Sequence, residues 1–260
     1  MTESKLLDLN DCNDSFKRVY EEILELALLK QPVWLQYFLK KSRLLQSYVG
    51  YNHWSRAWEY PWAIYVAELT AHCRVLDVGG GGSSLPDYLS KLGHEVYVID
   101  PSLRDGVNLY FDKNKSLFRN LRSFIFRTTM NLLKINSVEG IHSIRKTSGI
   151  KYLAQKASSI DYPDNYFDRV FCLSVMEHIP KDEWKVCMAE FERVLKKGGH
   201  LVITLDMTID ESNERLYMRL INYSSLKLIG DPHYEVPISR EDRVKRHGHL
   251  YETIGLVWQA

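Results

Sequence analysis

The sequence has few cysteines and no long apolar run. Its 260 residues include four cysteines, which are Cys12, Cys73, Cys172 and Cys187. No two of them are close enough in sequence to predict a zinc site or a redox motif, so we expect buried free thiols and no bound metal. No run approaches the ~18 apolar residues of a membrane-spanning helix, and the opening Met-Thr-Glu-Ser-Lys lacks the apolar core of a signal peptide. These absences predict a cytoplasmic protein without a membrane span.

A strong net charge of either sign is also missing. Lys and Arg number 34 against 33 Asp and Glu, which gives a formal net charge of +1. A balance so close to neutral does not predict nucleic acid or an anionic membrane surface as a partner. With 45% hydrophobic residues the chain can bury a large core, and we expect one main domain with an appendage. Nothing in the composition points to a particular oligomeric state.

Residues 1–66 are predicted to form an N-terminal helical cap. Apolar residues between positions 14 and 48 recur at close to helical spacing, and Pro32 divides them into two stretches. An aromatic segment follows, in which Trp54, Trp58 and Trp62 share a helical spacing. Such a stripe indicates either core packing or one wall of a cofactor site, and the sequence favours neither.

Short apolar runs alternate with amphipathic segments from Arg74 onward. The predicted strands cover residues 74–78, 95–99, 150–154, 169–173, 200–205 and 253–258, and the predicted helices cover residues 85–92, 180–197 and 213–228. This alternation is typical of a doubly wound α/β fold, in which helices cover both faces of a parallel sheet.

A long connection separates the second and third predicted strands. It spans about fifty residues after Asp100, far more than a helical crossover needs, so we predict a mostly helical insertion, or lid, at residues 101–150. Between residues 101 and 156, eleven Lys and Arg face three Asp and Glu, a local excess of eight positive charges. Such an excess indicates either a solvated face or a region that receives an anionic acceptor.

Four consecutive glycines, Gly79 to Gly82, follow the first strand of the α/β region. Glycine is unfavourable inside helices and strands, so the run predicts a sharp turn or a close approach of the backbone to a ligand. The turn leads into a helix whose first N–H groups have no partner within the helix. Asp100 ends the next strand about twenty residues on, where a carboxylate can accept hydrogen bonds from both hydroxyls of a ribose. These residues together predict a site for a nucleotide-like cofactor.

The motifs around this site resemble one family more than another. A dinucleotide fingerprint would need a third glycine where this chain has Ser84, which argues against a nicotinamide or flavin cofactor. The chain instead resembles class I S-adenosylmethionine-dependent methyltransferases. The residues that carry this resemblance are, in the family's order, Asp77-x-Gly79-x-Gly81, Asp100, residues 164–179 and residues 193–203.

The resemblance covers about residues 74–205, apart from the insertion. It implies a doubly wound, mostly parallel seven-stranded α/β sheet, with a methyltransferase domain at residues 67–260 behind the helical cap. It also implies S-adenosylmethionine as the cofactor and S-adenosylhomocysteine as the released product.

Further implications concern the methionine end of the cofactor. In this family the residues at Gly79 and Gly81 let the backbone lie against the methionine portion, and the acid at Asp77 bonds its amino group. Leu173 and Ser174, after the fourth strand, are implied to offer backbone carbonyls to the same ammonium.

The adenosyl end depends on Asp100 for the ribose and on the loop after the third strand for the adenine. The family's acid or amide in that loop is replaced within Lys156-Ala157-Ser158, and the resemblance transfers the adenine contacts to Ala157 and Ser158. Upstream, Arg56 is expected to pair with the cofactor carboxylate and Tyr60 to cover the cofactor.

His178 is the candidate catalytic residue. It lies just beyond the fourth strand, and an imidazole titrates near neutral pH, so it can act as a general base for a hydroxyl or amine acceptor. A structural role for His178 stays open, and Glu177 is expected to orient a neighbouring loop.

The expected reaction is methyl transfer to an oxygen or nitrogen of a small molecule or metabolite, with an anionic or carrier-bound acceptor as one option. The Asn/Asp-Pro-Pro-Tyr tetrad of nucleic-acid amino methyltransferases does not follow the fourth strand, so no nucleic-acid partner is expected. Two alternatives stay open. They are a nicotinamide-dependent oxidoreductase on a related sheet and a non-catalytic cofactor-binding module.

Overall fold

The computed structural model describes residues 5–7, 13–29, 36–37, 56–103, 149–208, 216–230 and 251–260. Within these residues the strands are β1 (Lys5–Leu7), β2 (Arg74–Val78), β3 (Glu95–Ile99), β4 (Lys151–Leu153), β5 (Phe167–Leu173), β6 (Leu195–Thr208), β7 (Lys227–Leu228) and β8 (Tyr251–Gln259). The helices are α1 (Asp14–Leu29), α4 (Arg56–Val66), α5 (Leu85–Lys91), α8 (Trp184–Val194) and α9 (Leu216–Tyr223), with short 3₁₀ turns η2 (Gly80–Gly82), η3 (Pro101–Leu103) and η4 (Met176–His178).

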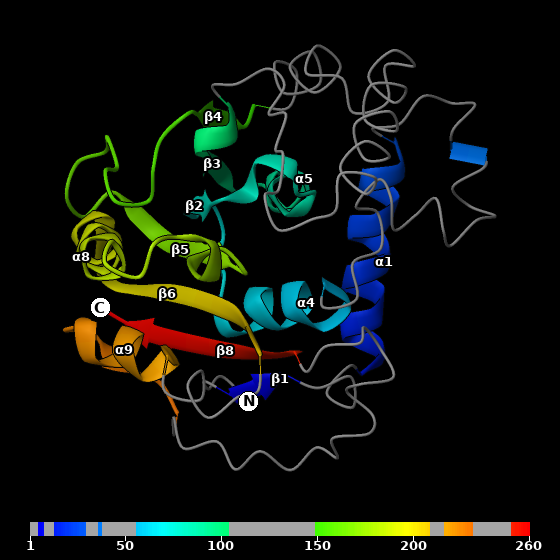
Figure 1. Cartoon of the computed structure of the whole chain (residues 1–260). Helices are drawn as coiled ribbons and strands as arrows, with labels where there is room; N and C mark the ends of the chain where they lie inside the picture. The colour runs from blue at the N-terminus through cyan, green and yellow to red at the C-terminus, as the bar shows by residue number, and fades with distance from the viewer. Residues whose placement is uncertain are drawn as a thin grey trace, which may run out of the picture.

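All these strands belong to one sheet with the order β1-β8-β6-β5-β2-β3-β4, and β7 pairs with β8 off this path (Figure 1). The five strands from β4 to β6 run parallel to one another. At the other side β8 is antiparallel to β6, and both β1 and β7 are antiparallel to β8. The mostly parallel sheet predicted from the sequence is confirmed, with β7 as an additional short strand beyond the seven on the main path.

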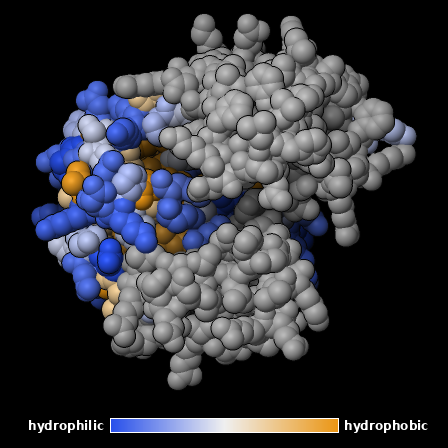
Figure 2. All heavy atoms as spheres, in the orientation of Figure 1, coloured by the Kyte–Doolittle hydropathy of each residue, from blue (hydrophilic) through white to orange (hydrophobic). Residues whose placement is uncertain are grey.

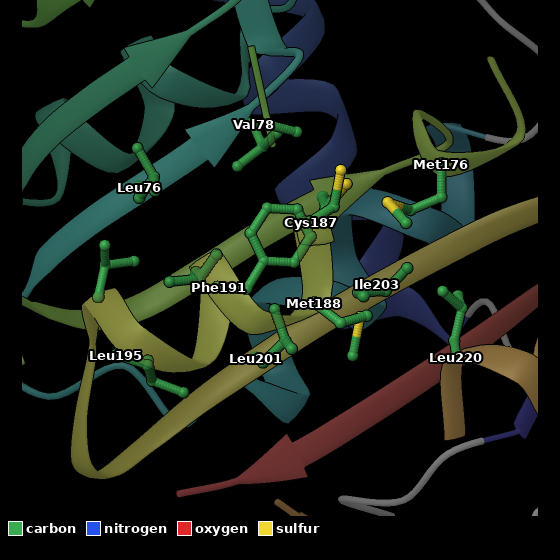
Figure 3. Close-up of a cluster of buried hydrophobic side chains, with 14 of the residues drawn as sticks. Leu76, Val78, Met176, Cys187, Met188, Phe191, Leu195, Leu201, Ile203 and Leu220 are labelled. Carbon is green, nitrogen blue, oxygen red and sulfur yellow. The ribbon is translucent and has the colours of Figure 1, made fainter. Parts of the chain in front are cut away.

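Helices cover both faces of the sheet (Figure 1). Neighbouring residues of a strand point to opposite faces, so Leu76 packs in the core that faces α8 and α9, whereas Val75 packs in the core that faces α1, α4 and α5. Figure 3 shows the first core, where Met188 and Phe191 of α8 lie against the strands. Burial on both faces explains why the central strands are continuous apolar runs in the sequence.

Trp58 and Trp62 of α4 belong to the core on the other face. Their exposed fractions are 3% and 2%, and they pack with apolar residues of α1, α5 and the sheet. The structure therefore assigns these two residues to core packing, and Trp54 lies outside the described residues.

Some predicted boundaries are wrong. The helix predicted over residues 213–228 is described only from Leu216 and ends at Tyr223, and the Lys227–Leu228 pair forms β7. The helix ends there because Ser224 and Ser225 turn to Glu192 of α8, which accepts from the Ser225 N–H at 2.8 Å and from both hydroxyls.

The helix predicted over residues 180–197 is also shorter in the structure, where α8 spans Trp184–Val194. Leu195 has an extended backbone, with φ −80° and ψ 134°, and begins β6. Most of the predicted insertion at residues 101–150 and most of the second stretch of the cap lie outside the described residues, which include only residues 101–103 and 149–150 of the insertion.

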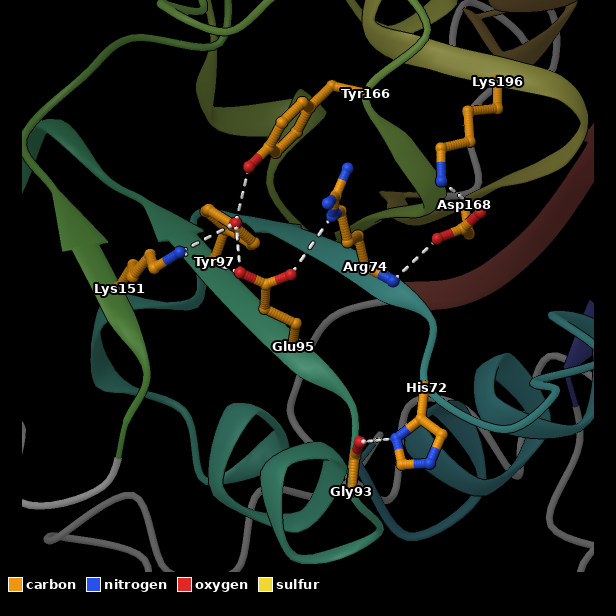
Figure 4. Close-up of polar contacts among 9 residues, drawn as sticks. All are labelled: His72, Arg74, Gly93, Glu95, Tyr97, Lys151, Tyr166, Asp168 and Lys196. Carbon is orange, nitrogen blue, oxygen red and sulfur yellow. Dashed lines mark hydrogen bonds and ion pairs between the residues drawn. The ribbon is translucent and has the colours of Figure 1, made fainter.

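A polar network joins the amino ends of three strands (Figure 4). Glu95 accepts from Arg74 Nε at 3.1 Å, from Lys151 Nζ at 2.8 Å and from the Tyr97 hydroxyl at 2.6 Å. The hydrogen bonds from Lys151 and Tyr97 lower the pKa of Glu95 to about 2. This network links β2, β3 and β4 at the edge opposite to the glycine turn.

The described surface is mostly polar in the view of Figure 2, with isolated apolar residues. Within the described residues, no helix is long and apolar enough to cross a membrane. Cys73, Cys172 and Cys187 are buried free thiols.

Gly255→Ala tests the packing of α4 on the sheet. An added Cβ at Gly255 of β8 would overlap the buried ring of Trp62, with Cζ2 only 2.7 Å away. We expect the variant to lose roughly 1–3 kcal/mol of unfolding free energy in urea, because overpacking forces the ring or the strand to shift. Gly82→Ala is the control, since its Cβ would meet no atom within 4 Å. Equal stability of the two variants would contradict this packing.

Candidate functional site

The glycine turn lies where β2 ends. Gly79 has φ 78°, and its N–H donates to the Ile99 carbonyl at 2.8 Å, so the turn is joined to the end of β3. A Cβ at Gly79 would clash with the Val175 side chain, which follows β5. Both the positive φ and the close approach require glycine here, as the sequence predicted.

Asp100 is held against this turn. Its Oδ2 accepts from the Gly81 N–H at 3.1 Å, and its Oδ1 accepts from the Ser102 N–H at 2.8 Å. A Cβ at Gly81 would lie 2.6 Å from Asp100 Oδ2. Two N–H groups use only part of the acceptor capacity of a carboxylate, which has about four lone-pair sites. Asp100 is therefore fixed in place and still able to accept hydroxyl donors.

Asp77 is buried beneath the turn. It is 3% exposed, and its Oδ2 has no hydrogen-bond partner among the described residues. Burial, together with the charges of Asp100 and Glu59, raises the pKa of Asp77 from 3.8 to about 8, although Arg56 opposes the shift. A buried acceptor without a donor is costly. A ligand ammonium would supply the missing donor, so Asp77 fits the predicted role.

The backbone after β5 reaches the same place. Ser174 is buried and has φ 49°, unusual for a residue other than glycine. Its N–H donates to the Thr204 carbonyl at 3.0 Å and to Thr204 Oγ1 at 2.9 Å. Because Val175 contacts the position of Gly79, the structure brings Leu173 and Ser174 close to the glycine turn.

Arg56 and Tyr60 of α4 lie beside the turn. The Tyr60 hydroxyl is 3.1 Å from Ser83 Oγ, and the Arg56 guanidinium carbon lies 5.2 Å from the centre of the Tyr60 ring. Arg56 forms an ion pair with Glu59. Burial alone would lower the pKa of Arg56, but the charges of Glu59, Tyr60 and Asp206 and the hydrogen bond to Glu59 together outweigh it, and the pKa is raised. Both predicted residues are therefore near the turn, and Arg56 has a protein partner that the sequence did not reveal.

Glu59 itself was missed by the sequence analysis. It is fully buried, with 0% exposure, and it accepts from Arg56, from the Ser174 hydroxyl at 2.7 Å and from the Thr204 hydroxyl. The sequence does show an acid within an apolar, aromatic helical segment. Such an acid indicates a buried charge, and a buried charge requires partners. The sequence could not say which distant residues would supply them.

Glu177 and His178 form part of η4, after β5. Glu177 Oε1 accepts from the Asp206 N–H at 3.1 Å, which ties η4 to β6, and Oε2 has no partner among the described residues. Burial and the charge of Asp206 raise the pKa of Glu177 to about 8. His178 is exposed. Burial raises the pKa of Asp206, and a positive charge on His178 opposes this shift. Glu177 thus contacts a neighbouring segment, while His178 stays accessible.

Ala157 and Ser158 follow β4 and contact α8 and the residue before it. Ala157 packs in the core shared with α8, and the Ser158 hydroxyl donates to Glu183 at 2.9 Å. The Asp100 N–H donates to the Leu153 carbonyl at 3.1 Å, so the end of β4 adjoins Asp100. The adenine contacts of Ala157 and Ser158 stay predictions.

The comparisons with known proteins agree with this arrangement. The profile of the methyltransferase-domain family matches residues 129–203, which include β5, η4 and α8 but not the glycine turn. The resemblance to class I methyltransferases is confirmed by this match together with the fold, and S-adenosylmethionine is the cofactor of that class. A comparison with curated protein sequences finds no match.

Two solved structures illustrate the similarity of fold. The YcgJ protein of Bacillus subtilis has 15% sequence identity and a TM-score of 0.51, over 77% of this chain and 97% of its own. The [4+2]-cyclase SpnF has 16% identity and a TM-score of 0.52, over 80% of this chain and 82% of its own. Because a cyclase shares the fold, the reaction must be argued from the site.

Asp77→Asn tests the burial of this acid. Between pH 4 and pH 8 the folded protein keeps a proton on Asp77 that the unfolded chain has lost, so this group makes stability fall as pH rises. The amide of Asn does not titrate, so it adds no such pH dependence to the stability. As the pH rises from 5 to 8, the unfolding free energy of the variant should therefore increase relative to that of the parent, by at most roughly 1.4 kcal/mol per pH unit.

The measurement is urea unfolding of the unliganded protein at both pH values, with Asp14→Asn at the exposed start of α1 as the control. Parallel pH profiles for parent and Asp77→Asn would show that Asp77 has an ordinary pKa.

Proposed function

We propose that this chain transfers the methyl group of S-adenosylmethionine to an oxygen or nitrogen of a small molecule or metabolite. The observation that carries the proposal concerns Asp77 Oδ2, which is buried beneath a glycine turn that also holds Asp100 and has no hydrogen-bond partner in the part of the chain that the structure describes. When bound, the cofactor supplies a sulfonium methyl that is already activated, so the protein mainly aligns the reactants and excludes water.

Residues around the turn would bind the methionine end. Asp77 would accept from the ammonium, and the carbonyls of Leu173 and Ser174 would accept from the same group. The absence of a side chain at Gly79 and Gly81 would let the backbone lie against the ligand.

The carboxylate and the adenosyl end of the cofactor would be bound by other residues. Arg56 would pair with the cofactor carboxylate, since a guanidinium has five N–H donors and Glu59 uses only part of them. Asp100 would accept from the ribose hydroxyls, Tyr60 would cover the cofactor, and the loop at Ala157 and Ser158 would contact the adenine.

His178 would take the proton from the acceptor. His178 is exposed next to the buried Met176 of η4, and this position supports the proposal because an acceptor could reach the imidazole from solvent. The basic excess at residues 101–156 supports an anionic or carrier-bound acceptor as one option. The division into a cap at residues 1–66 and a methyltransferase domain at residues 67–260, the cytoplasm as compartment and the lack of a nucleic-acid partner remain parts of this proposal.

Calorimetry with S-adenosylhomocysteine tests the proposal directly. We expect saturable binding, and we expect labelled methyl from S-adenosylmethionine to enter a small-molecule fraction of a cell extract. A fluorescence titration with NADH is the parallel assay for the oxidoreductase alternative. Binding of NADH without any heat from S-adenosylhomocysteine would reject the methyltransferase, whereas cofactor binding without label transfer would favour a non-catalytic module.

Asp100→Ala should weaken S-adenosylhomocysteine binding by about tenfold or more, because it removes charge-assisted hydrogen bonds to the ribose worth ~1.5–3 kcal/mol each. Calorimetry measures the affinity, and circular dichroism checks the fold. Asp14→Ala on α1 serves as the control for loss of an exposed acid. Unchanged affinity in Asp100→Ala would remove the ribose assignment.

His178→Ala should slow methyl transfer by roughly 10²-fold or more while leaving S-adenosylhomocysteine affinity unchanged, as expected for loss of a general base. Label transfer and calorimetry on the same preparation separate the two effects. Full activity would assign His178 to structure.

A further inference from the structure

Glu59 is the most completely enclosed acid among the described residues, with no exposed surface. It lies on α4, outside the sheet, and among the described residues three donors contact it, of which one follows β5 and one lies within β6. These donors are the guanidinium of Arg56, the hydroxyl of Ser174 at 2.7 Å and the hydroxyl of Thr204. An ionised carboxylate is costly to bury, and these three donors compensate it.

Two of these donors belong to residues that the proposed function assigns to the methionine end. Arg56 would pair with the cofactor carboxylate, and the Ser174 carbonyl would receive the ammonium. The left-handed backbone of Ser174, with φ 49°, is unfavourable for serine and needs support from its surroundings. The bond from the Ser174 hydroxyl to Glu59 supplies part of that support.

Thr204 completes the arrangement. Its hydroxyl oxygen accepts from the Ser174 N–H at 2.9 Å and donates to Glu59. Glu59, Ser174 and Thr204 therefore form a closed set of hydrogen bonds that joins α4, the segment after β5 and β6. A closed set restricts each member more than a single bond would.

We propose that Glu59 is a positioning residue, which fixes Arg56 and Ser174 relative to each other so that together they recognise the amino-acid end of the cofactor. This inference rests on the proposed function and adds a residue to it. Glu59 acts through its two partners, so its effect should be confined to ligands that carry the amino-acid group.

Two ligands separate this role from a general structural one. S-adenosylhomocysteine carries the amino-acid group, whereas 5′-methylthioadenosine carries the same adenosyl thioether without it. Glu59→Gln keeps the size of the side chain and an acceptor oxygen but removes the charge that holds Arg56. We expect it to weaken S-adenosylhomocysteine binding by about tenfold or more, and to change 5′-methylthioadenosine binding by less than about threefold.

Glu25→Gln on the exposed side of α1 is the matched control and should leave both affinities unchanged. An equal loss for the two ligands, or no loss for either, would overturn the inference while leaving the proposed function in place. If the parent protein binds no S-adenosylhomocysteine, the proposed function fails and the inference fails with it.

Ser174→Ala decides the matter if Glu59→Gln does not fold. It deletes only the hydroxyl that donates to Glu59 and keeps the backbone carbonyl. We expect the same preferential loss for S-adenosylhomocysteine, smaller than in Glu59→Gln. Equal affinities of parent and Ser174→Ala for S-adenosylhomocysteine would refute the positioning role.

Discussion

The parallel alignment of five strands is the constraint on which the candidate site depends. Parallel strands end at a common edge, so the residues that follow β2, β3 and β5 meet although up to about a hundred residues separate them in sequence. The turn after β2 depends on this proximity, since the Gly79 N–H donates a hydrogen bond to the end of β3 and Gly79 packs against Val175. Without the alignment, the glycine run would be only a loose loop.

The two edges of the sheet carry acids in opposite electrostatic conditions. At the amino edge Glu95 is half-exposed and surrounded by donors, which lower its pKa. At the carboxyl edge Asp77 and the less enclosed Glu177 each have one buried oxygen without a partner among the described residues, and their pKa values are raised. The first arrangement stabilises the unliganded fold. The second leaves acceptors for which a ligand can supply donors, at the expense of stability.

Local patterns were enough to predict the central strands, the glycine turn and Asp100, because apolar runs and glycines report local backbone needs. Glu59 could not be interpreted in this way, since its donors Ser174 and Thr204 lie more than a hundred residues away in sequence. The end of α9 was missed for the same reason: Glu192 of α8, not a local glycine or proline, stops that helix. The short β1 has too few residues to give a period, and its partner is at the far end of the chain.

The position of β8 has a consequence for the order of folding. β8 lies between β6 and β1, and Gly255 of β8 leaves the space that Trp62 of α4 fills. During synthesis the amino-terminal segments emerge first, yet β1 has no ladder and α4 no complete packing surface until β8 has left the ribosome. Closure of this side of the protein therefore waits for β8 and has a high contact order, and until β8 pairs, the outer edge of β6 is open to pairing with another chain.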